Sequence, residues 1–123
     1  MITALAVAIA GGIGAMLRFA VDGVIARRHR RRVPLGTLVI NVTGSFGLGL
    51  LTALALHDPG LGQWRTVLGT GLMGGYTTFS TASVEAVNLA MADGSRAVAR
   101  AGIHVAAMLV ASMLAAWLGL ALG

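Results

Sequence analysis

The sequence contains no cysteine and few charged side chains, and each shortage excludes classes of protein. Without cysteine, the chain has no disulfide, no thiol nucleophile and no thiolate metal ligand. Charged residues make up 11% of its 123 residues, whereas soluble domains average about 25%. Hydrophobic residues make up 57%. Because so few polar residues could not cover a surface in water, we expect an all-α membrane protein with one domain over residues 1–123.

Lysine is also absent, and only four residues are acidic. No two carboxylates are paired in the sequence, so no enzyme site is expected. The nine basic residues are all arginine, and five of them fall within residues 27–32, between two hydrophobic segments. This position favours a cytoplasmic loop beside anionic lipid head groups over a nucleic-acid site. The first hydrophobic segment has no positive region before it, so we expect a retained helix and not a signal peptide.

Four hydrophobic segments are predicted as membrane helices, at about residues 2–25, 35–56, 64–91 and 97–122. A membrane helix needs about 20 residues. The third segment has 28 residues and would be about 42 Å long as a single helix, longer than the bilayer core of about 30 Å. We therefore expect it to be interrupted at residues 74–78. Glycines in the first three segments predict close helix packing, including contacts between subunits.

Four polar residues inside the segments allow more than one role. Arg18 either pairs with Asp22, one turn away, or extends to the interface. Asn41 either makes an interhelical hydrogen bond, worth about 0.6–2 kcal/mol, or donates N–H to an anion. His104 has no second histidine four residues away, so it is more typical of a hydrogen-bonded packing residue than of a metal ligand.

An interruption in a membrane helix frees backbone groups that suit ions. Freed carbonyls suit a small cation such as Na⁺, and freed N–H groups suit an anion. Beyond the interruption, polar side chains recur at helical spacing in two stripes, one of Thr78, Thr81, Glu85 and Asn88 and a second of Ser80 and Ser83. Hydroxyl groups can line an anion pathway because they donate without a fixed charge. The positive ring edge of Phe79 could face an anion, although packing is the commoner role.

Three motifs, in this order along the chain, resemble those of the CrcB/Fluc fluoride channels. They are Gly-Gly-Ile-Gly-Ala-Met-Leu-Arg-Phe at 11–19, Pro-Leu-Gly-Thr-Leu-Val-Ile-Asn-Val-Thr-Gly at 34–44 and Gly-Leu-Met-Gly-Gly-Tyr-Thr-Thr-Phe-Ser-Thr at 71–81. The resemblance covers essentially the whole chain, and the third motif is the most specific.

The resemblance implies a fluoride-specific channel that lowers cytoplasmic fluoride by passive efflux. It implies an antiparallel dimer with two pores and a structural, non-transported Na⁺ at its centre, bound by the carbonyls of Gly74 and Thr77. It also places Asn41, Phe79 and, on a looser alignment, Ser112 in the pore. The hydroxyl stripes add Ser80, Thr81 and Ser83 to the expected fluoride pathway. Structural roles are expected for Arg18, Gly75 and Glu85.

Two features depart from the family pattern. Ala82 stands where the family has a second pore phenylalanine. The loops after the first and third segments contain seven arginines, and the opposite side contains Arg65 alone. This bias predicts one orientation in the plasma membrane, with both termini outside. The partner is then a second copy of the chain or, given the bias and Ala82, an oppositely oriented paralogue.

Two other functions remain open from the sequence. One is a small proton-coupled transporter subunit that uses Glu85 or His104. The other is a pore-deficient partner subunit of a heterodimeric fluoride channel, because Ala82 removes one ring of the expected pore lining.

Overall fold

The computed structural model describes residues 1–29 and 34–123, and all its regular elements in those ranges are helical. Three helices there are long and apolar enough to cross a membrane: α1 (Ile2–Arg28), α2 (Leu35–His57) and α6 (Ala97–Leu122). These helices match the expected first, second and fourth segments, with α1 ending three residues later than expected. The prediction of an all-helical membrane protein is therefore confirmed for these three segments.

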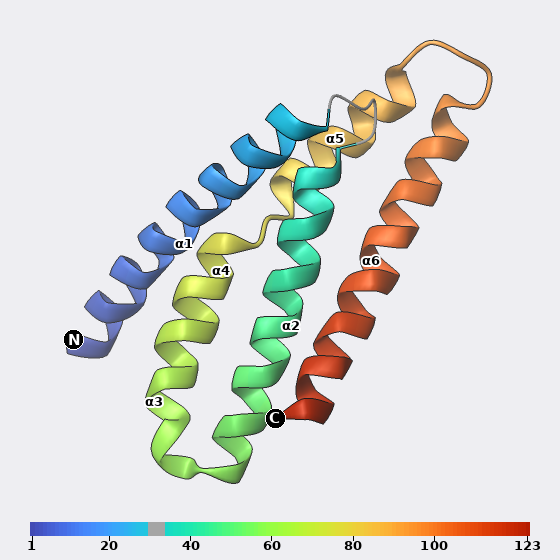
Figure 1. The fold of residues 1–123 in the computed structure, drawn as a ribbon. Coiled ribbons are helices and arrows are strands. Elements are labelled where there is room, and N and C mark those ends of the chain that lie inside the picture. The colour runs from blue at the N-terminus through green and yellow to red at the C-terminus, as the bar shows by residue number, and fades with distance from the viewer. Residues whose placement is uncertain (30–33) are drawn as a thin grey trace.

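The remaining hydrophobic segment consists of short pieces that follow one another along the chain. They are η1 (Pro59–Leu61), α3 (Gly62–Trp64), the π-helix η2 (Arg65–Met73), α4 (Gly74–Tyr76) and α5 (Ser80–Met91). From α3 to α4 the pieces form one continuous rod, and α5 leaves it in a different direction (Figure 1). The interruption itself covers residues 77–79. An interruption was expected at 74–78, and the observed one overlaps this range at 77 and 78 but begins later, because Gly74–Tyr76 is helical.

The glycines before the interruption bring two helices into backbone contact. A Cβ atom at Gly75 would collide with the carbonyl of Gly11, and one at Gly14 would collide with the carbonyl of Leu72. A Cβ atom at Gly71 would lie 2.8 Å from the Val7 oxygen. Glycine is therefore needed here because α1 approaches so closely, and not because the chain bends at these residues.

Glycines also bring α2 and α6 into backbone contact. A Cβ atom at Gly49 would collide with the carbonyl of Ala116, and one at Gly119 would collide with the carbonyl of Phe46. The side chains buried between the helices are few and mostly small, with Ile40 the largest of the fully buried ones. These glycines thus make close contacts within one chain.

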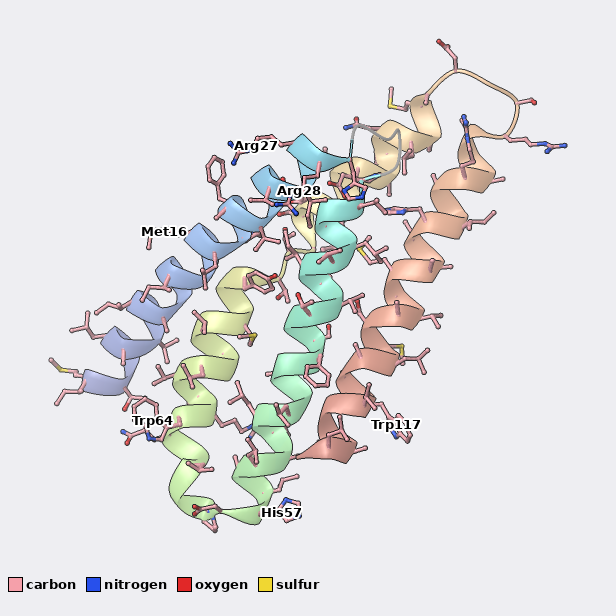
Figure 2. The ribbon with its side chains drawn as sticks, viewed as in Figure 1. Met16, Arg27, Arg28, His57, Trp64 and Trp117 are labelled. Atoms are coloured by element: carbon pink, nitrogen blue, oxygen red, sulfur yellow. The ribbon has the colours of Figure 1, made fainter. Side chains whose placement is uncertain are left out.

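The two ends of the bundle differ in the side chains they carry. Figure 2 shows Arg27 and Arg28 at one end, and His57, Trp64 and Trp117 toward the other. Both termini lie toward the tryptophan end with the turn after α2, and the C-terminal ends of α1 and α5 lie at the arginine end (Figure 1). Tryptophan and arginine are typical of the two interfaces of a membrane protein. Three arginines of the predicted loop, Arg30, Arg31 and Arg32, lie outside the described residues.

Candidate functional site

The interruption at 77–79 removes helical hydrogen bonds, among them those of the Gly74 and Thr77 carbonyls. In an unbroken helix, the Thr78 N–H would donate to the Gly74 carbonyl and the Thr81 N–H to the Thr77 carbonyl. Here the Thr78 N–H donates to Asn41 Oδ1 at 2.8 Å, and the Thr81 N–H donates to Thr78 Oγ1 at 3.2 Å. The Gly74 and Thr77 carbonyls have therefore both lost their helical donors.

Asn41 on α2 acts as a hydrogen-bond partner for both backbone groups of Thr78. Its Oδ1 accepts from the Thr78 N–H, and its Nδ2 donates to the Thr78 carbonyl at 2.9 Å. Nδ2 also lies 3.4 Å from Met108 Sδ, so both amide hydrogens have an acceptor. A backbone group left without a partner in lipid costs several kcal/mol. Of the two roles considered for Asn41, the structure contains the interhelical hydrogen bond.

A cavity of about 660 Å³ opens beside the interruption. The residues predicted from the family pattern that line it are Asn41, Gly74, Thr77, Phe79 and Ser112. Ala82 and Met108 line the same cavity. Within the described residues, the buried Ser112 hydroxyl has no hydrogen-bond partner. The structure therefore brings five of the predicted site residues together around one space.

Phe79 is the most exposed of these residues, with 88% of its surface accessible. Its ring is therefore not packed within its own chain, which was the commoner role considered for it. Ala82 lies one turn further along α5 and lines the same cavity. A methyl group at this position leaves the cavity wider than a phenylalanine would.

The hydroxyl groups beyond the interruption point in different directions. Thr78 Oγ1 donates to Thr81 Oγ1 at 3.0 Å, and both threonines line a smaller cavity of about 340 Å³. Ser80 is exposed and lies 3.4 Å from Thr78 Oγ1. Ser83 Oγ donates to the Phe79 carbonyl at 2.9 Å, within its own helix. Thr81 thus faces the interior, and the Ser83 hydroxyl is satisfied locally.

Arg18 and Asp22 both line the smaller cavity, together with Thr37. Among the described residues, no ion pair joins Arg18 to Asp22. Asp22 instead lies against Gly36, where a Cβ atom would collide with its carboxylate. Arg18 therefore borders the space between α1, α2 and α5, and the described part of the chain contains no ion pair between it and Asp22.

Glu85 and His104 lie further toward the arginine end. Glu85 Oε1 accepts from Thr37 Oγ1 at 2.6 Å, and Thr37 is only 1% exposed. Glu85 and His104 line a third cavity, of about 940 Å³. In the described part of the chain, Glu85 Oε2 and His104 Nε2 are buried without a hydrogen-bond partner. His104 Nε2 therefore lacks the hydrogen bond expected of a packing histidine.

Thr37 and Met108 were not identified from the sequence, although helical spacing contains a signal for both. Thr37 lies one turn before Asn41 on α2. Met108 lies one turn after His104 and one turn before Ser112 on α6. Residues four apart share a face of a helix, so each residue belongs to a row that faces α5.

The donor set suits a hard monovalent cation better than a transition metal. No group of three His, Cys, Asp or Glu residues able to hold a metal exists among residues 1–29 and 34–123. The Gly74 and Thr77 carbonyls are among the groups that have lost their helical donors. Carbonyl oxygen is a ligand for hard cations, so the residues present fit Na⁺.

Comparison with known proteins gives consistent matches over almost the whole chain. Residues 5–120 match the family described as CrcB-like protein, Camphor Resistance (CrcB). The fluoride-specific ion channel FluC 1 of Leifsonia xyli subsp. xyli is 56% identical over 97% of this chain and 85% of its own length. FluC 2 of Cutibacterium acnes is 53% identical over 98% of this chain and 97% of its own length. FluC 2 of Geobacillus kaustophilus is 44% identical over 95% of this chain and 89% of its own length.

Proposed function

The chain belongs to the CrcB family, and from that premise we propose that it is a subunit of a fluoride channel that lowers cytoplasmic fluoride by passive efflux. The sequence-based resemblance is confirmed by the family match and by relatives named as fluoride-specific ion channels. The observation that carries the proposal is the interruption held by Asn41, which lies beside a cavity whose polar lining residues are all uncharged.

The proposed pathway follows the inward stripe of α5. It begins at the cavity of Asn41, Phe79 and Ser112, passes Thr78 and Thr81, and ends near Asn88 in the third cavity. Hydroxyl and amide groups can replace the hydration of fluoride without binding it through a full positive charge. Ser80 and Ser83 lie beside this stripe and complete the proposed lining.

The Gly74 and Thr77 carbonyls are the proposed ligands of a structural Na⁺ at the centre of a dimer. Two subunits would supply two such pairs of oxygens. When bound, the ion would fix the interrupted backbone and would not be transported. Support comes from the loss of the helical donors of both carbonyls and from the exposed position of Gly74.

The proposed assembly is an antiparallel dimer in the plasma membrane, with the interrupted segment as a fourth crossing made of two half-helices. Arg27, Arg28, Arg96 and Arg100 belong to the arginine end, and Arg65 belongs to the opposite end. Orientation follows this count, which favours both termini outside. The strong difference in arginine count between the two ends favours an oppositely oriented paralogue as partner. The alanine at position 82, in place of the second phenylalanine, favours the same partner.

Fluoride efflux from liposomes tests the proposal. The chain is reconstituted alone and with a co-expressed paralogue, and a fluoride electrode follows efflux after a potassium ionophore is added. We expect fluoride efflux but no chloride efflux, with a rate that does not change when a proton gradient is imposed. Efflux driven by the proton gradient would instead support a transporter. Absence of fluoride efflux in both preparations would overturn the proposal.

Two variants refine the experiment. Ala82→Phe restores the family pattern, so efflux that appears only with this variant or with the paralogue would identify a pore-deficient subunit. Replacing Na⁺ by a larger cation such as N-methylglucamine is expected to destabilise the dimer in detergent. Unchanged dimer stability without Na⁺ would contradict the Na⁺ site without affecting the channel proposal.

A further inference from the structure

The side-chain amide of Asn41 is held in one orientation, which leaves one of its hydrogens in a weak bond. Asn41 Oδ1 accepts from the Thr78 N–H at 2.8 Å, and Nδ2 donates to the Thr78 carbonyl at 2.9 Å. An amide turned over would place its nitrogen against the N–H and its oxygen against the carbonyl, so the two bonds fix which atom is which. One Nδ2 hydrogen is therefore committed to the backbone of the interruption. The second is directed to Met108 Sδ, 3.4 Å from Nδ2.

Met108 is a poor acceptor for this second hydrogen. It lies on α6, which packs against α2 (Figure 1), and only 6% of its surface is exposed. A thioether sulfur accepts hydrogen bonds only weakly. A hydrogen bond from an N–H to an anion is roughly twice as strong as one to a neutral acceptor. An anion that reaches Nδ2 should therefore replace the sulfur as the acceptor.

The cavity beside the interruption gives an anion access to this hydrogen, because Asn41 and Met108 both line it. Ser112 lies one turn beyond Met108 on α6 and lines the same cavity. Its buried hydroxyl has no hydrogen-bond partner within the described residues. A hydroxyl without an acceptor and an amide hydrogen with a weak one are thus available to the same space. Both groups can donate, so the occupant that suits them is a strong acceptor.

We infer that Met108 is the displaceable acceptor of the fluoride site. Fluoride takes the second Asn41 hydrogen from Met108 Sδ, and the sulfur accepts it again when the ion leaves. This inference rests on the proposed function, which supplies the ion. One hydrogen bond replaces another in this exchange, no covalent bond forms or breaks, and the two bonds that hold Thr78 are unchanged.

The strength of the Asn41–Met108 bond then sets how tightly the cavity holds fluoride. Conduction requires that an ion bind strongly enough to enter and weakly enough to leave. With no acceptor in the empty site, the amide hydrogen would be unpaired, and a bound fluoride would be hard to release. A weak acceptor satisfies the empty site and lowers the affinity for the ion. Met108 is therefore a residue that determines affinity without contacting the ion.

Met108→Leu tests this role, because it removes the sulfur and keeps a similar volume. Fluoride should bind to this variant more tightly by about two- to tenfold, the factor that corresponds to one net hydrogen bond. A purely structural role predicts the opposite change. Loss of packing around Asn41 would loosen the site and weaken the binding of fluoride.

The side-chain resonances of Asn41 measure the affinity without conduction. Asn41 and Asn88 are the only two asparagines of the chain, so protein labelled with ¹⁵N-asparagine gives two side-chain amides, which Asn88→Asp assigns. Titration with sodium fluoride in detergent should move one Asn41 amide proton, and sodium chloride should not move it. The matched control is Met113→Leu, because Met113 lies on the same helix and is 64% exposed. Its midpoint should equal that of the unmodified protein.

An equal or higher midpoint in Met108→Leu, or Asn41 protons that fluoride does not move, would overturn the inference. Liposome efflux of the same proteins separates this result from a failure of the proposed function. A lower midpoint in Met108→Leu without fluoride efflux from either protein would contradict the channel and leave the role of Met108 standing. Fluoride efflux with equal midpoints would contradict the role of Met108 alone.

Discussion

The two halves of the interrupted segment differ in how they contact the rest of the molecule. The half before the interruption, η2 and α4, presses its backbone against α1 through Gly71 and Gly75. The half after it, α5, has no buried residue and directs polar side chains toward cavities. The first half holds the segment in place, and the second carries the hydrogen-bonding groups that the proposed channel would offer to an ion. A membrane helix can serve both purposes because the interruption lets the two halves point in different directions.

The first half depends on backbone shape, and its glycines should tolerate no side chain. The largest loss of stability is expected for Gly75→Ala, because the added methyl would meet the backbone of Gly11, which cannot move aside. Forced overpacking costs about 1–3 kcal/mol or more. Thermal unfolding in detergent, followed by size exclusion, measures the loss.

The neighbouring Gly74→Ala provides the control for this prediction. A Cβ atom there has nothing within 4 Å, and alanine is the better helix former by up to about 1 kcal/mol. Gly74→Ala should therefore unfold at the same temperature as the unmodified protein or higher. Equal destabilisation by both variants would show that backbone contact with α1 is not what requires glycine.

The interruption itself depends on one amide side chain. Asn41→Leu removes the partners of the Thr78 N–H and carbonyl, and each unpaired buried group costs about 1–3 kcal/mol. We expect faster hydrogen exchange at residues 78–81, measured by mass spectrometry, and loss of fluoride efflux. Asn41→Asp keeps the acceptor for the Thr78 N–H, so its exchange should be intermediate. Exchange equal to that of the unmodified protein in Asn41→Leu would contradict this role.

Within α5 itself, the side chain of Glu85 is hydrogen-bonded to Thr37 of α2. Thr37→Val removes the donor to Glu85 Oε1, and hydrogen bonds to charged groups contribute about 1.5–3 kcal/mol. The matched control is Thr52→Val on the same helix, whose hydroxyl bonds only to Leu48 of its own helix at 2.8 Å. Thermal unfolding should show a clear loss for Thr37→Val and little change for the control.

The smallest effect is expected at the exposed edge of α5. The Ser80 hydroxyl lies 3.4 Å from Thr78 Oγ1, at the limit of a hydrogen bond, and the residue is exposed. Ser80→Ala should change the unfolding free energy by less than about 0.5 kcal/mol. If the stability is unchanged but the fluoride efflux falls, Ser80 contacts the ion and the two halves differ in function as well as in packing.

The hydrophobic segments and the existence of an interruption could be predicted from the sequence, because length and apolar composition are local properties. The position of the interruption could not. Gly74 and Gly75 look like helix breakers in isolation, and only the contact of Gly75 with Gly11 explains why glycine stands in a helix there. The π-helix from Arg65 to Met73 left no signal in the sequence that we recognised.

The candidate site could also be predicted only in part: its residues could be identified from the sequence, but the contacts between them could not. The residue type of Asn41, and the family resemblance for Thr77 and Ser112, pointed to ion chemistry, and the structure places all three on one cavity. The bonds of Asn41 to Thr78 and of Thr37 to Glu85 join residues 37 and 48 positions apart. Contacts at such separation depend on how the helices meet, which composition and periodicity do not specify.

The Asn41–Thr78 contact also has a consequence for biosynthesis. Ribosomes make α2 before the interrupted segment, so Asn41 exists before the Thr78 backbone needs it. An exposed peptide group is costly in an apolar phase, so we expect the interrupted segment to be completed only against an α2 that is already in place. The order of these two segments in the gene is then also their order of assembly.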